Sequence, residues 1–93
     1  MDEPASIDIA DNVIHCRGRW TLQHLADLER QIASLRWPQG EVTACDASQV
    51  TAMDTGGAVL LQTTMMDGRR RGQPLPLQGL QQEFAALLER IDG

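Results

Sequence analysis

The stretch DASQVTAMDTGG, residues 46–57, decides how the fold is interpreted. It continues a short apolar run, VTACDAS at residues 42–48, of the kind found in strands that are buried on both faces of a sheet. It ends at DTGG, where an aspartate and a threonine before two glycines predict the start of a helix. Two carboxylates, two hydroxyl side chains and a glycine pair therefore lie where the sequence predicts that a strand gives way to a helix.

The residues before this stretch begin with a predicted β-hairpin. In SIDIADNVIHCRG, residues 6–18, Ile7 and Ile9 alternate with polar neighbours, and Asp11 and Asn12 are typical turn residues. We expect the residues after the turn to return as the second strand of the hairpin.

An amphipathic helix is predicted in WTLQHLADLERQIASL, residues 20–35. Thr21 is the expected N-cap, because its hydroxyl can accept a hydrogen bond from a free N–H group of the first turn. Pro38 and Gly40 then end the helix. Apolar residues at every third or fourth position predict one buried stripe, formed by Leu22, Leu25, Leu28, Ile32 and Leu35.

A second helix is predicted from Asp54 to Gly72. Apolar residues again recur at helical spacing, at Ala58, Leu61 and Met65. The three arginines at positions 69–71 complement the negative end of the helix dipole. We interpret these arginines as a helix end rather than as a binding patch.

The C-terminal residues predict one strand and one further helix. PLPLQGL, residues 74–80, contains Pro74 and Pro76, whose missing N–H groups place the strand at the edge of a sheet. LQQEFAALLERI, residues 80–91, has an apolar helical face formed by Phe84, Leu87, Leu88 and Ile91.

The predicted elements follow one another in the order β-β-α-β-α-β-α, which is an α/β fold. Right-handed crossovers make the second, third and fourth strands parallel neighbours, and the hairpin leaves the first strand antiparallel at one edge. We therefore predict a mixed four-stranded sheet with helices mainly on one face, in a single domain over residues 1–93.

Composition narrows the possible functions. The 93 residues are 42% apolar, which is enough for one small core. The net charge of -5 and the absence of lysine argue against nucleic-acid binding, because phosphates are bound by clustered cations. No apolar run approaches the roughly 18 residues of a membrane-spanning helix. Cys16 and Cys45 lie in strand-like runs and are predicted to be buried, reduced thiols, which indicates a cytoplasmic compartment.

The element order and the stretch at residues 46–57 together resemble the STAS family, the sulfate transporter and anti-sigma factor antagonist domains. The family pattern has an aspartate that closes a strand, a serine or threonine two residues on, and an aliphatic residue two further. An Asp–Ser/Thr–x–Gly sequence then opens the next helix. The matching residues here are Asp46, Ser48, Val50, Asp54, Thr55 and Gly57. The resemblance covers nearly the whole chain and implies a STAS (anti-sigma factor antagonist-like) fold.

Within the family, the chain looks most like the STAS domains of Mla-type lipid-transport ABC systems. The features in common are Thr55, the entry GRWTLQHL at residues 18–25, and GLQQEFAALLERI at residues 79–91. This resemblance implies a non-catalytic regulatory or assembly domain that contacts the ABC ATPase subunit and the permease at the cytoplasmic face of the inner membrane. The chain would be either a free subunit or the N-terminal cytoplasmic part of a longer ABC permease.

The resemblance gives the polar junction two alternative roles. Thr55 matches the hydroxyl that an anti-sigma factor kinase phosphorylates in anti-sigma factor antagonists, and a phosphate at a helix start would meet free N–H groups. In the lipid-transport branch the same position contacts the ATPase subunit, and we favour this contact. A ligand-sensing STAS domain is a third alternative. The expected partner-binding residues are Asp46, Ser48, Asp54, Thr55, Gly56 and Gly57.

Two features of the junction lead to further expectations. Gly57 is expected to permit the close approach of another backbone or of a partner surface. Asp46 and Asp54 could act as an acid–base pair only in a cleft with opposed environments, and the sequence shows no other sign of a cleft. Phosphate-loop and metal-ligand spacings are absent from the sequence. We therefore predict no catalytic residue, no metal and no cofactor.

Overall fold

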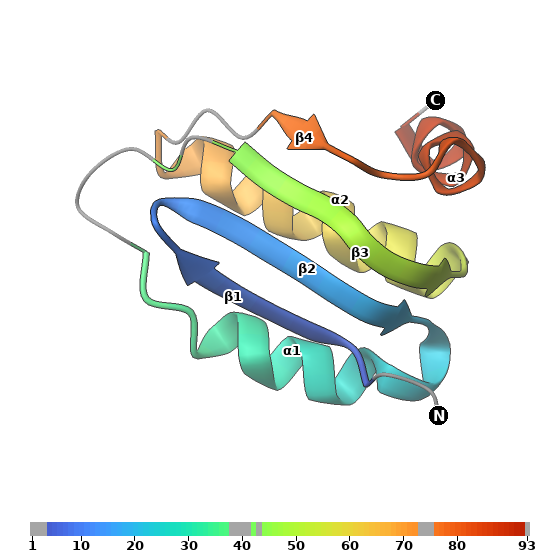
Figure 1. Cartoon of the computed structure of the whole chain (residues 1–93), viewed down its shortest axis with the longest axis horizontal. Coiled ribbons are helices and arrows are strands. Elements are labelled where there is room, and N and C mark those ends of the chain that lie inside the picture. The colour runs from blue at the N-terminus through green and yellow to red at the C-terminus, as the bar shows by residue number, and fades with distance from the viewer. Residues whose placement is uncertain (1–3, 38–41, 43, 73–75, 93) are drawn as a thin grey trace.

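The computed structural model describes residues 4–37, 42, 44–72 and 76–92, and it has the predicted order of elements (Figure 1). The strands are β1 (Ser6–Ala10), β2 (Val13–Trp20), β3 (Ala44–Met53) and β4 (Leu77–Gln78). The helices are α1 (Leu25–Ala33), α2 (Thr55–Arg70) and α3 (Gln82–Asp92), and a short 3-10 turn, η1 (Leu22–His24), precedes α1.

The four strands form one mixed sheet in the spatial order β1-β2-β3-β4. β1 is antiparallel to β2, whereas β2, β3 and β4 are parallel to one another. This confirms the predicted topology, including the position of β4 at an edge. β4 is shorter than the predicted strand, and Pro74 lies outside the described residues. The carbonyl of Pro76 accepts a hydrogen bond of 3.0 Å from the N–H of Cys45, so this proline still joins the ladder as an acceptor.

The hairpin between β1 and β2 turns at the predicted residues. Asp11 has φ 53° and Asn12 has φ 63°, in the left-handed region that aspartate and asparagine tolerate better than most other residues. Two such residues make the tight turn whose twist matches that of the flanking strands.

One face of the sheet is apolar and covered by helices, and the other face is open. α1 packs on β1, α2 packs on β2 and β3, and α3 lies beside α2 (Figure 1). The shortest extent of the molecule is 20 Å, which is the thickness of one sheet layer and one helix layer. The prediction of helices mainly on one face is therefore confirmed. The open face carries polar side chains, including Asp8, His15, Arg17 and Asp46.

The core between the two layers takes residues from every helix. Leu28 of α1, Leu61 of α2 and Phe84 of α3 belong to the same buried cluster as Trp20, the last residue of β2. Trp20 is fully buried, and its indole N–H donates to the carbonyl of Arg17 at 3.2 Å. Trp20 is thus a core residue.

Cys16 and Cys45 lie in this core as free thiols, with their sulfur atoms 3.8 Å apart. A hydrogen bond with Cys45 and burial raise the pKa of Cys16 well above its usual value. A protonated, buried thiol is a poor nucleophile. The predicted burial of the two thiols is confirmed.

β3 continues through the first part of the 46–57 stretch, so the prediction that Asp46 closes the strand is wrong. The register of β3 against β2 shifts at two places, each with one extra residue on β3. Such insertions are β-bulges. Asp46 lies beside the first bulge, where its Oδ1 accepts a hydrogen bond from the N–H of Ser48 at 2.9 Å. The hydrogen bond between Asp46 and Ser48 stabilises a bulge inside β3, and the strand continues to Met53.

The helix after β2 also begins differently from the prediction. Thr21 precedes the η1 turn, and its side chain makes no capping hydrogen bond. The N–H of Leu22 donates instead to the carboxylate of Asp54 at the start of α2. The prediction of Thr21 as the capping side chain is wrong because an acceptor from a distant part of the chain takes this role.

The outer edge of β1 is covered by one side chain of α1. The Oε1 of Gln31 accepts a hydrogen bond from the N–H of Ile7 at 3.0 Å, and its Nε2 donates to the carbonyl of Ala5 at 3.1 Å. The same Nε2 donates to Asp27 of α1, which holds the amide in place. One side-chain amide therefore binds both a donor and an acceptor of the edge strand.

Candidate partner-binding site

Asp54 joins two helix starts at one end of the sheet. As the N-cap of α2, it accepts a hydrogen bond at Oδ1 from the N–H of Gly57 at 3.0 Å. Its other oxygen, Oδ2, accepts from the N–H of Leu22 at 2.9 Å, at the start of η1. Capping of α2 by Asp54 agrees with the sequence prediction. The second hydrogen bond connects α2 to the segment between β2 and α1.

The backbone reinforces this joint. The N–H of Asp54 donates to the carbonyl of Trp20 at 3.2 Å. Gly57 is buried against the same carbonyl, and a Cβ atom at position 57 would overlap the oxygen of Trp20. Only glycine allows the first turn of α2 to lie so close to the end of β2. The group that lies close to Gly57, as predicted, is thus the backbone carbonyl of Trp20 in this chain.

The carboxylate of Asp54 remains ionised in this position. Burial alone would raise its pKa, but N–H groups of Gly57, Leu22 and Gly56 donate to the carboxylate and lower the pKa below its usual value. The negative charge lies at the positive end of the α2 dipole, which is also favourable.

The joint presents two exposed side chains. Thr55 is exposed at the first position of α2, and the side chain of Leu22 is 70% exposed. The side chains of Leu22 and Leu25 lie close to Gly56, directly after Thr55. A hydroxyl and an apolar side chain from two separate segments therefore border the same site.

Sequence reasoning missed Leu22 as a surface residue. It was predicted to belong to the buried stripe of α1, but it lies in η1, where the rotation per residue differs from that of an α-helix. Its position is fixed by the hydrogen bond to Asp54, and no local sequence pattern marks that bond.

The structure separates the six predicted partner-binding residues into two groups. Residues 54–57 form the joint described above. Asp46 and Ser48 lie at the first bulge of β3, eight and six residues before Asp54. At about 3.3 Å per residue they are roughly 20 to 26 Å from Asp54 along the strand. The two groups therefore do not form one continuous site.

Asp46 and Ser48 make contacts within this chain that account for their presence at the bulge without a partner protein. The backbone N–H and the hydroxyl of Ser48 lower the pKa of Asp46, and the Nδ1 of His15 lies 3.9 Å from Asp46 Oδ2. Gly79, after β4, packs so closely that a Cβ there would lie 2.7 Å from the Cβ of Ser48. Partner contact by these two residues stays a prediction.

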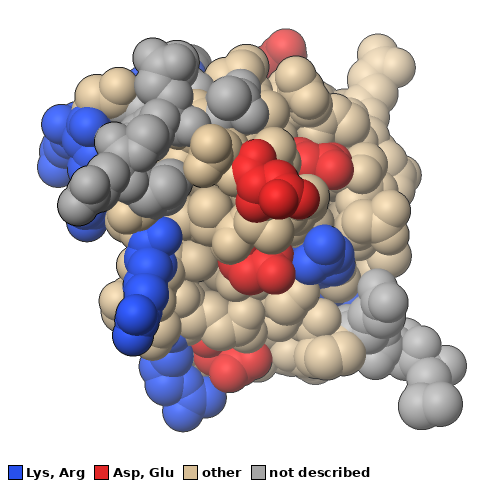
Figure 2. Space-filling model, turned by 60° about the vertical axis from the view of Figure 1, so that its left-hand side comes forward, with Lys and Arg blue, Asp and Glu red and all other residues tan. Residues whose placement is uncertain are grey.

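The charged side chains are of mixed sign. Figure 2 shows acidic groups near the middle of one face and basic groups mostly along its left side. Ion pairs at 3.1 Å join Arg17 to Asp8 and Arg71 to Asp67. Binding of a phosphate backbone requires clustered cations, and the face in Figure 2 has no broad basic area among its described residues.

The described part of the chain offers neither a metal site nor a membrane-spanning helix. No group of three or more His, Cys, Asp or Glu side chains in this part of the chain could hold a metal ion. None of the helices described is long and apolar enough to cross a membrane.

The mixed sheet in the order β1-β2-β3-β4, its single layer of helices and the Asp–Thr–Gly–Gly start of α2 define a STAS domain. The family model described as "Mlab, STAS domain" matches residues 5–92, and the chain belongs to this family. STAS domains are generally non-catalytic and mediate contacts between proteins. No curated protein matches the sequence.

Proposed function

We propose that this STAS domain is a regulatory or assembly module of an ABC-type lipid-transport system and that it docks on the ATPase subunit. The domain acts by protein contact and carries out no chemistry of its own. In this proposal it works at the cytoplasmic face of the inner membrane, close to the permease.

The observation that carries the proposal is the exposure of Thr55 on a joint whose backbone is held by Asp54 and Gly57. A surface that is already ordered loses little conformational entropy when a partner binds. The Thr55 hydroxyl can form a hydrogen bond, and the neighbouring Leu22 offers apolar area, as protein interfaces require. The description of the family, which names Mlab, supports the lipid-transport setting.

The second candidate function is an anti-sigma factor antagonist that a kinase partner switches by phosphorylating Thr55. The exposure of Thr55 favours this function. However, the N–H groups of Gly56 and Gly57 already donate to Asp54. A phosphate on Thr55 would meet a fixed carboxylate in place of free donors, which is unfavourable. We therefore rank partner contact above phosphorylation.

Titration calorimetry with the purified ATPase subunit tests the first function. Thr55→Glu should weaken binding by at least about tenfold, because an unmatched charge in an interface is costly. A thermal melt should change little, because position 55 is exposed and the helix dipole offsets the repulsion between one added charge and Asp54. Thr51→Glu is the matched control, because Thr51 is also exposed but lies on β3. Full affinity of Thr55→Glu for the ATPase subunit would contradict the proposal.

The two functions can be separated by mass spectrometry. The domain is incubated with ATP and the anti-sigma factor kinase, and the mass of the peptide that contains Thr55 is measured. Phosphorylated Thr55, together with no binding of the unmodified domain to the ATPase subunit, would favour the second function over the first.

A further inference from the structure

A groove runs between α1 and α2 on the outer surface of the helix layer. The two helices contact each other, and a cavity of about 370 Å³ between them is lined by residues that include Ile32 of α1 and Leu60, Thr63, Met66 and Arg70 of α2. We refer to this cavity as the α1–α2 groove.

The side of α2 that borders the groove leads back to the joint at Asp54. Leu22 and Leu25 lie beside Gly56, so the two helices already adjoin at the start of α2. Thr55, Val59, Thr63, Met66 and Arg70 follow one another at intervals of three or four residues, which places them along one side of α2. The proposed contact residue Thr55 therefore lies at one end of this line, and Arg70 lies at the other.

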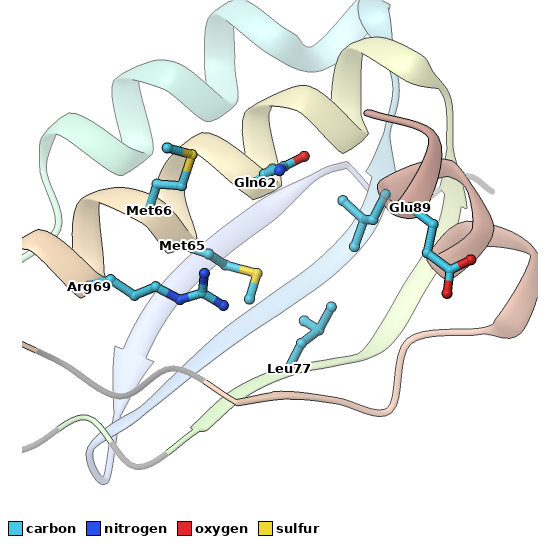
Figure 3. A pocket seen from close by; sticks show the side chains of 7 residues that line it. Gln62, Met65, Met66, Arg69, Leu77 and Glu89 are labelled. Atoms are coloured by element: carbon cyan, nitrogen blue, oxygen red, sulfur yellow. The ribbon is translucent and has the colours of Figure 1, made fainter. Parts of the chain in front are cut away.

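The exposed apolar side chains of the domain follow the same line. Leu22, Val59 and Met66 are the large hydrophobic residues that the described part of the chain leaves exposed, at 70%, 45% and 47%. Figure 3 shows Met66 directed toward α1, whereas Met65 and Arg69 extend from α2 in the direction of β4. An apolar partner surface on this side of α2 would cover Val59 and Met66 together.

The far end of the groove has positive charge that the described residues do not balance. Arg71 pairs with Asp67 at 3.1 Å and lies 5.3 Å from the centre of the Trp37 ring. Asp67 is the one acidic residue among the described residues that line the groove, and this pair neutralises it. Arg70 lines the groove and is exposed, and it forms no ion pair with any described residue. With respect to the described residues, the charge of Arg70 is unpaired, in a domain whose net charge is -5.

We propose that the α1–α2 groove receives an amphipathic α-helix of the partner protein. Its apolar stripe packs on Val59 and Met66, and an acidic side chain pairs with Arg70. Helix-in-groove docking uses apolar anchors at intervals of three and four residues, which matches this line of positions on α2. The inference rests on the proposed function, because it describes how the same ATPase subunit binds beyond Thr55.

Two charge reversals test the groove. Arg70→Glu should weaken binding to the ATPase subunit by at least about tenfold, because an attraction to an acidic helix becomes a repulsion. Arg69→Glu is the matched control: it makes the same change in charge in the same helical turn. Arg69 lines a different pocket, next to β4 and α3 (Figure 3), which has only Met66 in common with the groove among the described residues. Its reversal should therefore weaken binding by less than about threefold.

A photo-reactive side chain locates the bound segment. Placed at position 63, on the wall of the groove, it should crosslink to the ATPase subunit, and the linked peptide should be an acidic, amphipathic helix. Placed at position 86, an exposed residue of α3, it should give no such product.

Each result supports or overturns the inference. Equal losses for Arg70→Glu and Arg69→Glu, no loss for either, or a product at position 63 between two copies of this chain would each overturn it. If wild type binds the ATPase subunit and only Thr55→Glu reduces binding, the proposed function stands and the groove is rejected. If wild type does not bind this subunit, both are rejected.

Discussion

Asp46 and Asp54 belong to the same stretch of sequence and both have a lowered pKa. They differ in how far along the chain their hydrogen-bond partners lie. Asp46 accepts from the N–H of Ser48, two residues along the same strand. Asp54 accepts from Gly57 in α2 and from Leu22, 32 residues earlier in the chain. The first carboxylate supports a bulge, and the second joins two helix starts.

A lowered pKa alone therefore does not identify the carboxylate that contributes more to the stability of the fold. Asp46 lies on the open face of the sheet, where water can replace a lost acceptor. Loss of Asp54 leaves N–H groups without an acceptor at two helix starts, and it disconnects elements that are far apart in the sequence. We expect the loss in the free energy of unfolding to be larger for residues that join segments far apart in the sequence. The predictions below are ordered from the largest expected loss to the smallest.

Gly57→Ala should have the largest effect on the joint. The new methyl group would overlap the Trp20 carbonyl, a backbone group that cannot move without shifting the end of β2. We expect the free energy of unfolding to fall by about 3 kcal/mol or more, measured by denaturant unfolding.

Gly56→Ala is the control for this prediction. A Cβ there would lie 3.0 Å from the movable Cδ1 of Leu25 and 3.4 Å from Asp54 Oδ1. The free energy of unfolding should change by less than about 1 kcal/mol. Similar losses for both glycine variants would show that the contact with Trp20 is not the cause.

Asp54→Ala should have the second largest effect. It removes an acceptor from two helix starts, and we expect a loss of about 2 kcal/mol in the free energy of unfolding. Amide hydrogen exchange should become faster at both Leu22 and Gly57. Faster exchange at Gly57 alone would show that Asp54 acts only as a cap of α2.

Acid should weaken the same joint. Because the folded-state pKa of Asp54 is lowered, its contribution is complete above the ordinary carboxyl pKa of about 3.9 and is lost as pH falls through the folded-state value. Denaturant unfolding between about pH 5 and pH 2 should therefore show decreasing stability. Asp54→Asn should flatten this dependence more than Asp46→Asn does, and equal flattening would refute the ranking.

Asp46→Ala should have the smallest effect. It removes a local hydrogen bond on the open face of the sheet and a 3.9 Å contact with His15. We expect the free energy of unfolding to change by less than about 0.5 kcal/mol. A loss as large as that of Asp54→Ala would mean that the bulge in β3 contributes as much to the stability of the domain as the joint does.

The elements that the sequence predicted well depend on local patterns. The alternation of Ile7 and Ile9, the turn at Asp11 and Asn12 and the capping residue Asp54 each act within a few residues. Their geometry follows from steric preference and from hydrogen bonds along the chain, so one sequence is sufficient to place them.

The features that the sequence did not predict depend on contacts between distant segments. Polar residues at Asp46 and Ser48 are compatible with a strand end or with a bulge, and only pairing with β2 decides between them. The exposed Leu22 lies in the 3-10 turn η1, whose start is held by the hydrogen bond from the N–H of Leu22 to Asp54. Neither periodicity nor propensity contains this information, because both describe neighbours in sequence.

Gln31 has a consequence for the behaviour of many copies of this domain at high local concentration. A sheet with a free edge can grow from one molecule into the next by adding strands, which is the first step of aggregation. Here the side-chain amide already binds the N–H of Ile7 and the carbonyl of Ala5, and an incoming strand would have to displace it. The opposite edge, β4, spans only two residues, Leu77–Gln78, and gives a poor template. Domains crowded on a larger assembly are thereby discouraged from polymerising through their strands.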